Sequence, residues 1–373
     1  MNKKIQLLSL VSYQFLPPKM GGQKGIALFY HYFSKYVNLT CVTIKNNDIS
    51  YSNGYEILNI LSNSKIRYIY LPYFFALRKI IKQKEITHLI IEHPYYGWLG
   101  WLLKKFLKVK LIVHSHNIEG LRFRSMNKWW WHILWQYEKW AHRKADINFF
   151  ITDEDRGYAI THFGLHVEKC FTVTYGVELD QAPSSIERHK ARKIIESEYQ
   201  IAADEKILLF NGTLNYKPNL DAVDIILTKI NPILLLAKNF EYKIIICGKN
   251  LPADYKGLKD YEDKNIIFAG FVDDITLFFK AADIFINPVN DGGGIKTKLV
   301  EALGYNMDVV TTKSGAIGIS KNITGDKMKI EEHNNWEKFA QEIIRFNNSA
   351  DIPKEFFEYF YWGNIAEKCA AKL

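Results

Sequence analysis

The segment I-F-I-N-P-V-N-D-G-G-G-I-K-T-K-L-V-E-A-L-G-Y-N-M-D-V-V-T-T, residues 284–312, decides the fold class of this chain. Two short apolar runs, 284–287 and 309–312, have the length and composition of buried β-strands. Apolar residues between these runs recur at helical spacing and predict one buried face of an α-helix. They are Ile295, Leu299, Ala302 and Leu303. A strand–helix–strand unit of this kind builds a parallel sheet.

The same alternation of short apolar runs and helical patterns occupies most of the 373 residues. It predicts an α/β fold with two doubly wound, Rossmann-like domains, because two separate series of strands are present. The strands of the first series are expected at 5–11, 39–44, 88–91, 110–114 and 147–152, and those of the second at 207–211, 242–247, 266–268, 284–287 and 309–312. Ligands of such sheets bind beyond the carboxyl ends of the strands, so we expect the site in the cleft between the domains.

Charge and composition limit the partners of the chain. Hydrophobic residues make up 48% and charged residues 24% of it, as in ordinary soluble globular proteins. The net charge of +9 favours an anionic partner, either a phosphate-bearing ligand or an anionic membrane surface. The sequence has no dense basic run and no nucleic-acid module, so we do not expect nucleic acid as a partner.

The four cysteines lie far apart and favour a reducing, cytoplasmic setting, since neither a zinc site nor a disulfide framework is indicated. The apolar run at the N-terminus is short and interrupted by Gln6 and Ser9, which favours a buried first strand over a signal peptide. Because no apolar run approaches about 18 residues, we expect any membrane contact to be peripheral, at the inner face of the membrane.

Three consecutive glycines and two lysines open the helix predicted within 284–312. Lysines at the positive end of a helix dipole cost about 0.3–1 kcal/mol each when exposed. A bound diphosphate explains both features, because glycine amides and the helix N-terminus hold its oxygens while a lysine neutralises it. Glu301, one turn further on, can then accept hydrogen bonds from ribose hydroxyls. An intrahelical pair of Lys298 with Glu301 is the alternative, and it leaves the glycines unexplained. The residues of this predicted anion site are Gly292, Gly293, Gly294, Ile295, Lys296 and Lys298.

Further candidates follow other predicted strands. Gly21 and Gly22 open a helix after the first strand, where glycine amides can hold a ligand, but a plain strand-to-helix loop explains them equally well. Lys217 stands at the mouth of the loop after the strand 207–211, where it can meet a phosphate or simply be solvated.

Polar residues also cluster after the strand 110–114. His116, Asn117 and Glu119 can bind hydroxyl groups or a developing charge at the carboxyl end of that strand. A structural histidine is the alternative, and the sequence leaves both interpretations open.

Together these segments resemble the family 4 glycosyltransferases. The block 266–319 is similar to the donor half of that family, and F-N-G-T-L-N-Y-K-P-N, at 210–219, is similar to the opening of the same half. H-N-I-E, at 116–119, and the strand followed by D-E-D, at 153–155, are similar to motifs of the acceptor half.

The resemblance implies the GT-B architecture, with an acceptor-binding domain over 1–178, a donor-binding domain over 179–354 and a final helix, 355–373, that crosses back to the first domain. It implies a nucleotide-diphosphate sugar as co-substrate, transfer with retention of anomeric configuration, and neither a metal nor another cofactor. Glu301 matches the family's ribose-binding glutamate, and His116 lies near its active-site histidine. The other residues implied to bind the donor are Gly212, Thr213, Lys217, Gly248, Val272, Asp273 and the residues of the anion site.

We therefore expect a glycosyltransferase that uses a UDP- or GDP-sugar and a carbohydrate or lipid-linked acceptor, in bacterial-type surface polysaccharide, lipopolysaccharide or glycolipid synthesis. Its expected catalytic residues are His116, Lys298 and Glu301. The alternatives are a sugar-nucleotide epimerase or phosphorylase on the same fold, or a sugar-nucleotide-binding protein without catalysis. Many family members carry a further glutamate eight positions before the ribose-binding one. This chain has Gly293 there, so the resemblance does not specify the sugar.

Two segments allow a second interpretation. D-E-D at 153–155 matches the motif by which some sugar transferases bind a metal, but Thr152 followed by Asp155 also forms a capping-box-like helix start, which we favour. The aromatic and basic segment 129–144, W-W-W-H-I-L-W-Q-Y-E-K-W-A-H-R-K, can rest on an anionic membrane near a lipid-linked acceptor. A helix that packs its tryptophans into the core explains the same composition.

Overall fold

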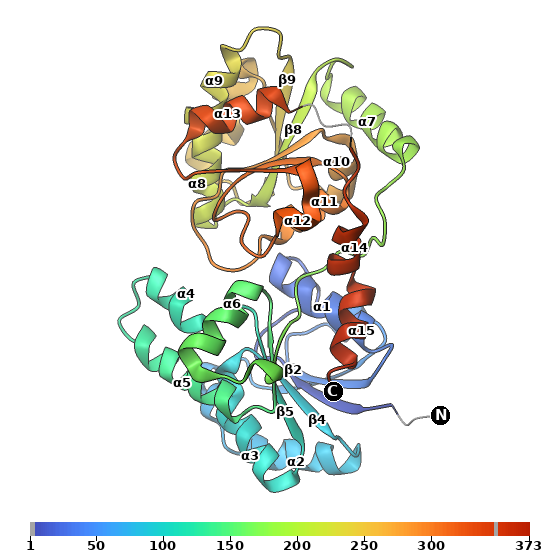
Figure 1. The fold of residues 1–373 in the computed structure, drawn as a ribbon, viewed down its shortest axis with the longest axis vertical. Coiled ribbons are helices and arrows are strands. Elements are labelled where there is room, and N and C mark those ends of the chain that lie inside the picture. Colours follow the sequence, from blue (N-terminus) through green and yellow to red (C-terminus); the bar gives the residue numbers. More distant parts are fainter. Residues whose placement is uncertain (1–3, 347–349) are drawn as a thin grey trace. The chain divides into compact units, whose positions relative to one another are not determined.

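The computed structural model describes residues 4–346 and 350–373. It divides into two compact units: unit 1 comprises Met1–Glu178 and Phe360–Leu373, and unit 2 comprises Leu179–Tyr359. Each unit contains one parallel β-sheet with helices packed on it (Figure 1). The predicted α/β fold with two doubly wound sheets is therefore confirmed, whereas the acceptor and donor roles of the two halves stay a prediction.

The sheet of unit 1 has seven strands in the order β3-β2-β1-β4-β5-β6-β7. All neighbouring strands in it are parallel. The strands are β1 (Gln6–Leu10), β2 (Asn38–Ile44), β3 (Glu56–Leu61), β4 (His88–Glu92), β5 (Lys110–Ser115), β6 (Ile147–Phe150) and β7 (Cys170–Thr172). The helices are α1 (Gly21–Phe33), α2 (Tyr73–Gln83), α3 (Gly97–Leu107), α4 (Glu119–Ser125), α5 (Trp131–Lys144), α6 (Asp153–Tyr158) and α15 (Trp362–Ala370).

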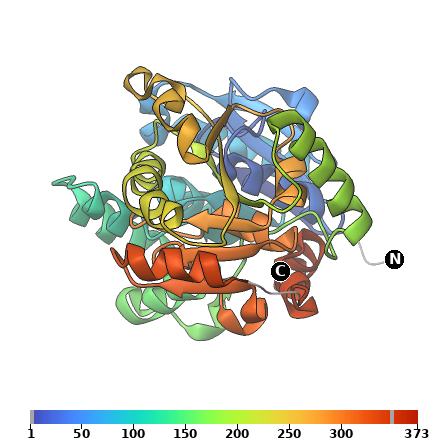
Figure 2. The same ribbon diagram turned by 90° about the horizontal axis from the view of Figure 1, so that it is seen from above.

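The sheet of unit 2 has six parallel strands in the order β10-β9-β8-β11-β12-β13. Helix α13 lies along β12 and β13, as the view turned by 90° shows in orange-red (Figure 2). The strands are β8 (Lys206–Thr213), β9 (Tyr242–Lys249), β10 (Ile266–Gly270), β11 (Ile284–Asn287), β12 (Asp308–Thr312) and β13 (Met328–Glu331). The helices are α7 (Ser185–Tyr199), α8 (Lys217–Ile225), α9 (Asn231–Leu235), α10 (Ile275–Ala281), α11 (Thr297–Gly304), α12 (Lys321–Thr324), α13 (Trp336–Arg345) and α14 (Lys354–Phe360).

Strand order reverses at one place in each sheet. In unit 1 the reversal lies between β1 and β4, and in unit 2 it lies between β8 and β11. Ligands of doubly wound sheets bind at such a switch point, beyond the carboxyl ends of the strands. The loops that follow these four strands are therefore the first places to look for a site.

All ten strands expected from the sequence are present, and three more stand at or near the sheet edges. Inner strands contain continuous apolar runs, as in β9, where Ile244, Ile245 and Ile246 are fully buried, because helices cover both faces of a parallel sheet. The strands that the sequence did not reveal are β3, β7 and β13. β3 is half-exposed along most of its length, β7 has three residues and β13 has four. Such short or half-exposed strands lack the continuous apolar run on which the prediction depended.

The C-terminal helix α15 belongs to unit 1. Trp362 is 2% exposed, and its ring centroid lies 6.3 Å from that of Phe29 in α1 and 5.4 Å from that of Tyr175. Val177 and Tyr361 form a parallel β-bridge beside it. The predicted return of the chain to the first domain is therefore confirmed from Phe360 onward. The single helix expected over 355–373 is instead two helices, and α14 before Phe360 belongs to unit 2.

Helix α5 carries the aromatic and basic segment. It buries Glu138, Ala141 and His142, and its tryptophans are only partly buried. Trp129, just before the helix, is 85% exposed, so burial in the core is the wrong interpretation for this residue. In the part of the chain that the structure describes, no helix is long and apolar enough to cross a membrane.

Candidate functional site

The loop between β11 and α11 holds the three consecutive glycines at the switch point of unit 2. Gly292 and Gly294 have φ angles of 97° and 69°. An L-residue adopts such a left-handed backbone only at a cost of about 1–2 kcal/mol, so the loop needs glycine at both positions. Gly293 between them is exposed. The helix begins directly afterwards, with Lys296 as its N-cap residue and without a side-chain cap.

Lys298, in the first turn of α11, reaches the end of β8. Its Nζ donates hydrogen bonds to the Asn211 carbonyl oxygen and to Asn219 Oδ1, both at 3.1 Å, and it lies 4.1 Å from the centroid of the Phe210 ring. All of these partners are uncharged. Burial, and then the neighbouring Lys296, lower the pKa of the Lys298 amine to about 7.

The side chain of Lys296 hydrogen-bonds the backbone of the glycine loop. Its Nζ donates to the carbonyl oxygens of Gly292 at 2.5 Å and Gly294 at 3.1 Å. Burial lowers its pKa to about 8, although Asp291 acts in the opposite direction. Among residues 4–346 and 350–373, no carboxylate forms an ion pair with Lys296 or Lys298. Two ammonium groups without a carboxylate at the start of a helix favour an anion there, and the binding of one stays a prediction.

Two buried amide oxygens lie at the ends of the strands that flank this switch point. Asn211 Oδ1 and Asn287 Oδ1 accept no hydrogen bond from any described residue. Asn287 Nδ2 donates to Thr311 Oγ1 at 3.0 Å, which fixes the amide with its oxygen unsatisfied. Unpaired buried acceptors are rare, so both amides are candidates for contact with a ligand or a water molecule at this switch point. Sequence reasoning missed both residues; an asparagine directly after an apolar run was the available signal.

Gly212 and Gly248 have a packing role in the same region. They are partners in the β8–β9 pair, and a Cβ on Gly248 would collide with the Gly212 carbonyl oxygen. A Cβ on Gly212 would lie 2.6 Å from Asn219 Nδ2, and that amide also donates to the Thr213 carbonyl oxygen at 3.1 Å. Gly248 therefore allows the close approach of β8 and β9, and Gly212 leaves room for Asn219, the asparagine that accepts from Lys298.

The remaining donor candidates lie around this loop and do not all converge on it. Lys217, the first residue of α8, has a side chain that is 82% exposed and pairs with Asp221 at 2.6 Å. Val272 and Asp273 follow β10, the edge strand of the sheet. Glu301 is partly buried within α11, one turn after Lys298. Ile295, which leads into the helix, is also partly buried. Their contacts with a donor stay predictions.

In unit 1 the loop after β1 leads into a helix start. Gly21 and Gly22 lie in the first turn of α1, and Gln23 Oε1 accepts the backbone N–H groups of Lys19 at 2.9 Å and Met20 at 3.1 Å. A Cβ on Gly22 would meet no atom within 4 Å. Packing therefore does not require glycine at position 22, and the backbone is open to a ligand there.

The switch point of unit 1 lies between β1 and β4, and β4 ends with a buried carboxylate, Glu92. It is 1% exposed. It accepts hydrogen bonds from Tyr30 Oη at 2.7 Å, His116 Nε2 at 2.7 Å and His114 Nδ1 at 3.0 Å. Burial alone would raise the pKa of Glu92, but the imidazoles of His114 and His116 hold it well below its usual range. The group is therefore an ionised carboxylate surrounded by donors.

A second buried carboxylate, Glu119, opens α4. Its Oε2 accepts hydrogen bonds from Tyr95 Oη at 2.7 Å and Arg122 Nε at 3.0 Å, and its Oε1 lies 3.4 Å from His93 Nδ1. Burial favours a higher pKa for this carboxyl, but His93 and then Arg122 lower it to about 2. Asn117, in the loop before α4, is partly exposed.

The rings of His93 and His116 lie between the two carboxylates. Their centroids are 4.5 Å apart with an interplanar angle of 33°. His93 has φ of 63°, a conformation that costs about 1–3 kcal/mol outside glycine and is concentrated at functional sites. Burial, and then His93, lower the pKa of His116 to about 4, against the effect of Glu92.

The structure thus joins His116 and Glu119 to residues that sequence reasoning did not select, namely Glu92, His93 and His114. The signal was present, because Glu92 and His93 directly follow the apolar run of β4, in the same way as the selected residues follow β5. Only the order of strands in the sheet makes β4 and β5 neighbours, and that order is not visible in the sequence.

The same residues offer a set of metal-type ligands. Atoms of Glu92, His114 and His116 all lie within 4.8 Å of one another, and zinc accepts such a set. Here they hydrogen-bond one another, and the expectation that no metal takes part stays a prediction. At the D-E-D segment, Thr152 Oγ1 accepts the Asp155 backbone N–H at 3.1 Å, so the predicted helix start is confirmed.

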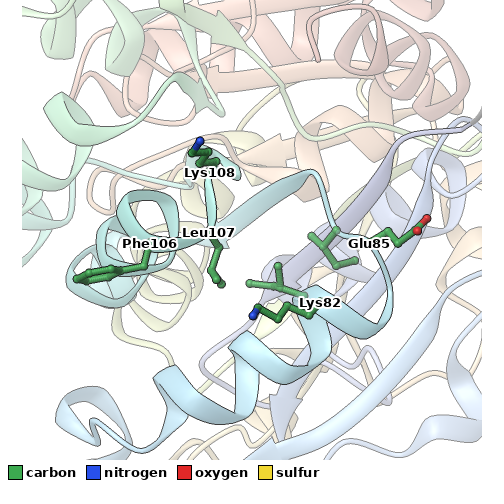
Figure 3. A pocket seen from close by; sticks show the side chains of 7 residues that line it. Lys82, Glu85, Phe106, Leu107 and Lys108 are labelled. Atoms are coloured by element: carbon green, nitrogen blue, oxygen red, sulfur yellow. The ribbon is translucent and has the colours of Figure 1, made fainter.

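A pocket of about 340 Å³ lies elsewhere in unit 1 (Figure 3). It is formed where α2 and α3 end, before β4 and β5 begin, and its lining includes Lys82, Glu85, Phe106, Leu107 and Lys108. Glu92, His93, His114 and His116, here called the Glu92 network, lie at the opposite ends of the same strands. The pocket is therefore separate from that network.

Two family models match the chain. Residues 49–181 match the model described as Glycosyltransferase Family 4, and residues 205–348 match the model described as Glycosyl transferases group 1. The first match covers most of unit 1, and the second lies within unit 2.

Two curated relatives are similar in sequence. An uncharacterized 44.6 kDa protein in the cps region of Klebsiella pneumoniae is 29% identical over 154 residues, which are 40% of this chain and 39% of that protein. The chitobiosyldiphosphodolichol beta-mannosyltransferase of Debaryomyces hansenii is 24% identical over 333 residues, which are 79% of this chain and 67% of that protein. The first match thus spans less than half of the relative's length.

Among solved structures, the Anabaena protein Alr3699/HepE in complex with UDP is similar over nearly the whole chain. The TM-score is 0.71 at 12% sequence identity, and the match covers 98% of this chain and 99% of that one. This likeness concerns the fold, and it confirms the predicted GT-B architecture.

Proposed function

Because the chain belongs to the family 4 glycosyltransferases, we propose that it transfers a sugar from a UDP- or GDP-sugar to a hydroxyl group with retention of anomeric configuration. The acceptor is a carbohydrate, free or lipid-linked, in surface polysaccharide, lipopolysaccharide or glycolipid synthesis. One relative is named for a cps region and another for a diphosphodolichol-linked acceptor, which supports this class of acceptor.

The observation that carries the proposal is the pair of lysines without carboxylate partners at the start of α11. Lys298 is held by two neutral oxygens and an aromatic ring, and Lys296 by two loop carbonyls. A buried ammonium group without a counter-ion is costly, and the diphosphate of a sugar nucleotide supplies that counter-ion. The glycine loop lets the phosphates approach the backbone.

Catalysis in this proposal is positioning and charge stabilisation. When the bond between the sugar and the diphosphate breaks, negative charge grows on the leaving phosphate, and Lys298 stabilises it. That phosphate then takes the proton of the acceptor hydroxyl on the same face of the sugar. Glu301 binds the ribose, Lys217 joins the phosphates from α8, and His116 contacts a hydroxyl of a sugar.

The test is thermal unfolding of the protein with UDP, GDP and their sugar derivatives. A ligand at 100 times its Kd adds about 2.7 kcal/mol to the free energy of unfolding, so one nucleotide series should raise Tm clearly. Lys298→Ala should abolish that rise and lower kcat by about 10²–10³-fold. The control is Lys256→Ala, which removes an exposed lysine paired with Asp260 and should change neither quantity.

Turnover separates the proposed reaction from the alternatives. A transferase releases nucleoside diphosphate when both donor and acceptor are present, whereas an epimerase interconverts sugar nucleotides without releasing it. A phosphorylase needs phosphate. Normal turnover by Lys298→Ala, or no thermal shift with any nucleotide, contradicts the proposed role of α11.

Exposed apolar side chains at the turn between α4 and α5 support a peripheral membrane contact. Met126, Trp129 and Ile133 are 52%, 85% and 66% exposed, and the exposed Arg124 and Lys128 flank them. Aromatic and basic side chains together bind anionic membrane surfaces. Co-sedimentation with anionic vesicles should occur in low salt and fall in Trp129→Ser; equal binding by this variant would contradict the contact.

A further inference from the structure

The strands β4 and β5 bring one carboxylate and two imidazoles onto the same face of the sheet. Glu92 and His114 are partners in the parallel register. Side chains of a strand alternate between the faces, so His116, two residues after His114, returns to the face of Glu92. The result is the Glu92 network described above, in which the carboxylate accepts from Tyr30, His114 and His116.

The network determines which nitrogen of His116 carries the proton. An ionised carboxylate is an acceptor only, so the His116 Nε2 that lies 2.7 Å from Glu92 must be the N–H nitrogen. Near neutral pH the ring is uncharged and holds one proton, since burial lowers its pKa. Nδ1 is therefore an acceptor. None of the described residues forms a hydrogen bond with His116 Nδ1, and the side chain is 14% exposed.

Two neighbouring imidazoles also flank the His116 ring. The centroid of the His93 ring lies 4.5 Å from that of His116 with an interplanar angle of 33°, and the His114 ring lies at 4.8 Å with an angle of 50°. His93 Nε2 hydrogen-bonds Tyr13 Oη at 3.3 Å, and His93 Nδ1 lies 3.4 Å from Glu119 Oε1. The Glu92 carboxylate thus holds His116, and two further imidazoles flank its ring.

We propose that Glu92 is a positioning residue, which fixes the tautomer of His116 so that Nδ1 accepts a hydrogen bond from a hydroxyl of the substrate sugar. This inference rests on the proposed function and adds a residue to it. Glu92 itself, 1% exposed beneath the rings, does not touch the substrate. A carboxylate behind a histidine is a common device for setting tautomer and orientation, and loss of such a partner typically costs about 10–100-fold.

The test compares wild type with Glu92→Gln by ¹⁵N NMR of the His116 ring and by kinetics. In wild type we expect the proton on Nε2 and none on Nδ1. In Glu92→Gln the charged acceptor is replaced by a neutral amide that can accept or donate, so the preference for Nε2–H should weaken and a measurable fraction of Nδ1–H should appear. We expect kcat to fall by about 10–100-fold while Tm with bound nucleotide is kept. The matched control is Glu56→Gln, a half-exposed carboxylate of the same unit that pairs with Lys84, and it should leave both readouts unchanged.

Three results would overturn the inference: a proton on Nδ1 in wild type, a changed tautomer with unchanged kcat, or a lower kcat with an unchanged tautomer. The wild-type spectrum decides even where Glu92→Gln does not fold. A failure of the proposed function looks different, because it leaves the protein without any nucleotide-induced thermal shift or turnover, whatever the tautomer of His116.

Discussion

At the scale of single residues, the charge of Lys298 gives a measurable pH dependence. Its pKa of about 7 in the free protein means that the ammonium form, which we propose binds the diphosphate, is lost as pH rises through that value. The affinity for a sugar nucleotide should therefore fall above about pH 7, by up to tenfold per pH unit. Isothermal titration between about pH 6 and 9 measures this.

Lys298→Arg is the matched variant, because a guanidinium stays protonated over that whole range. Its affinity should vary less with pH, with a remaining decline from Lys296, whose pKa is about 8. Identical pH profiles for wild type and Lys298→Arg would mean that the amine of Lys298 does not bind the donor.

Site residues could be predicted from the sequence where their charge is unfavourable for the predicted secondary structure. Lys296 and Lys298 stood out because lysines at a helix start are unfavourable, and no carboxylate among the described residues pairs with either of them. Glu92 and His93 showed no such conflict in the sequence. Their meaning depends on β4 lying beside β5 and on the positive φ of His93, and neither can be obtained from residue spacing.

At the scale of elements, the glycine loop before α11 gives a prediction about stability. Gly292 has φ of 97°, so Gly292→Ala should lower the free energy of unfolding by about 1–2 kcal/mol, as measured by urea denaturation. Gly157→Ala, within α6 and without any atom within 4 Å of the added Cβ, should instead keep or raise stability. Equal effects of the two substitutions would show that the loop tolerates a side chain.

Helices and strands with a clear apolar pattern were predicted from the sequence. Strands that are defined mainly by their pairing with a neighbouring strand were not. Three of the four residues predicted for the buried face of α11 are fully buried, namely Leu299, Ala302 and Leu303. The fourth, Ile295, precedes the helix and is only partly buried. The strands β3 and β13 were missed, because edge strands are half-exposed and their alternation is indistinct. Pairing with β2 and β12 makes them strands, and pairing is a property of the sheet.

At the scale of the whole molecule, the return of the chain to unit 1 should contribute measurably to stability. Trp362 is 2% exposed and packs on Phe29 and Tyr175. Trp362→Ala should therefore cost about 3–5 kcal/mol of unfolding free energy. Tryptophan-to-alanine at the exposed Trp129 is the control and should cost little. A small effect at Trp362 would mean that α15 contributes little to the core of unit 1.

The bridge between Val177 and Tyr361 also has a consequence for synthesis of the protein. The Val177 N–H donates to the Phe360 carbonyl oxygen at 2.7 Å, and the Trp362 N–H donates to the Val177 carbonyl oxygen at 3.0 Å. Unit 2 is thus an insertion in unit 1, with its entry and exit tied together. During translation unit 2 is complete before the segment that finishes unit 1 leaves the ribosome. Residues 179–359 are therefore the natural fragment to express alone, whereas a fragment that ends at Glu178 lacks its last helix.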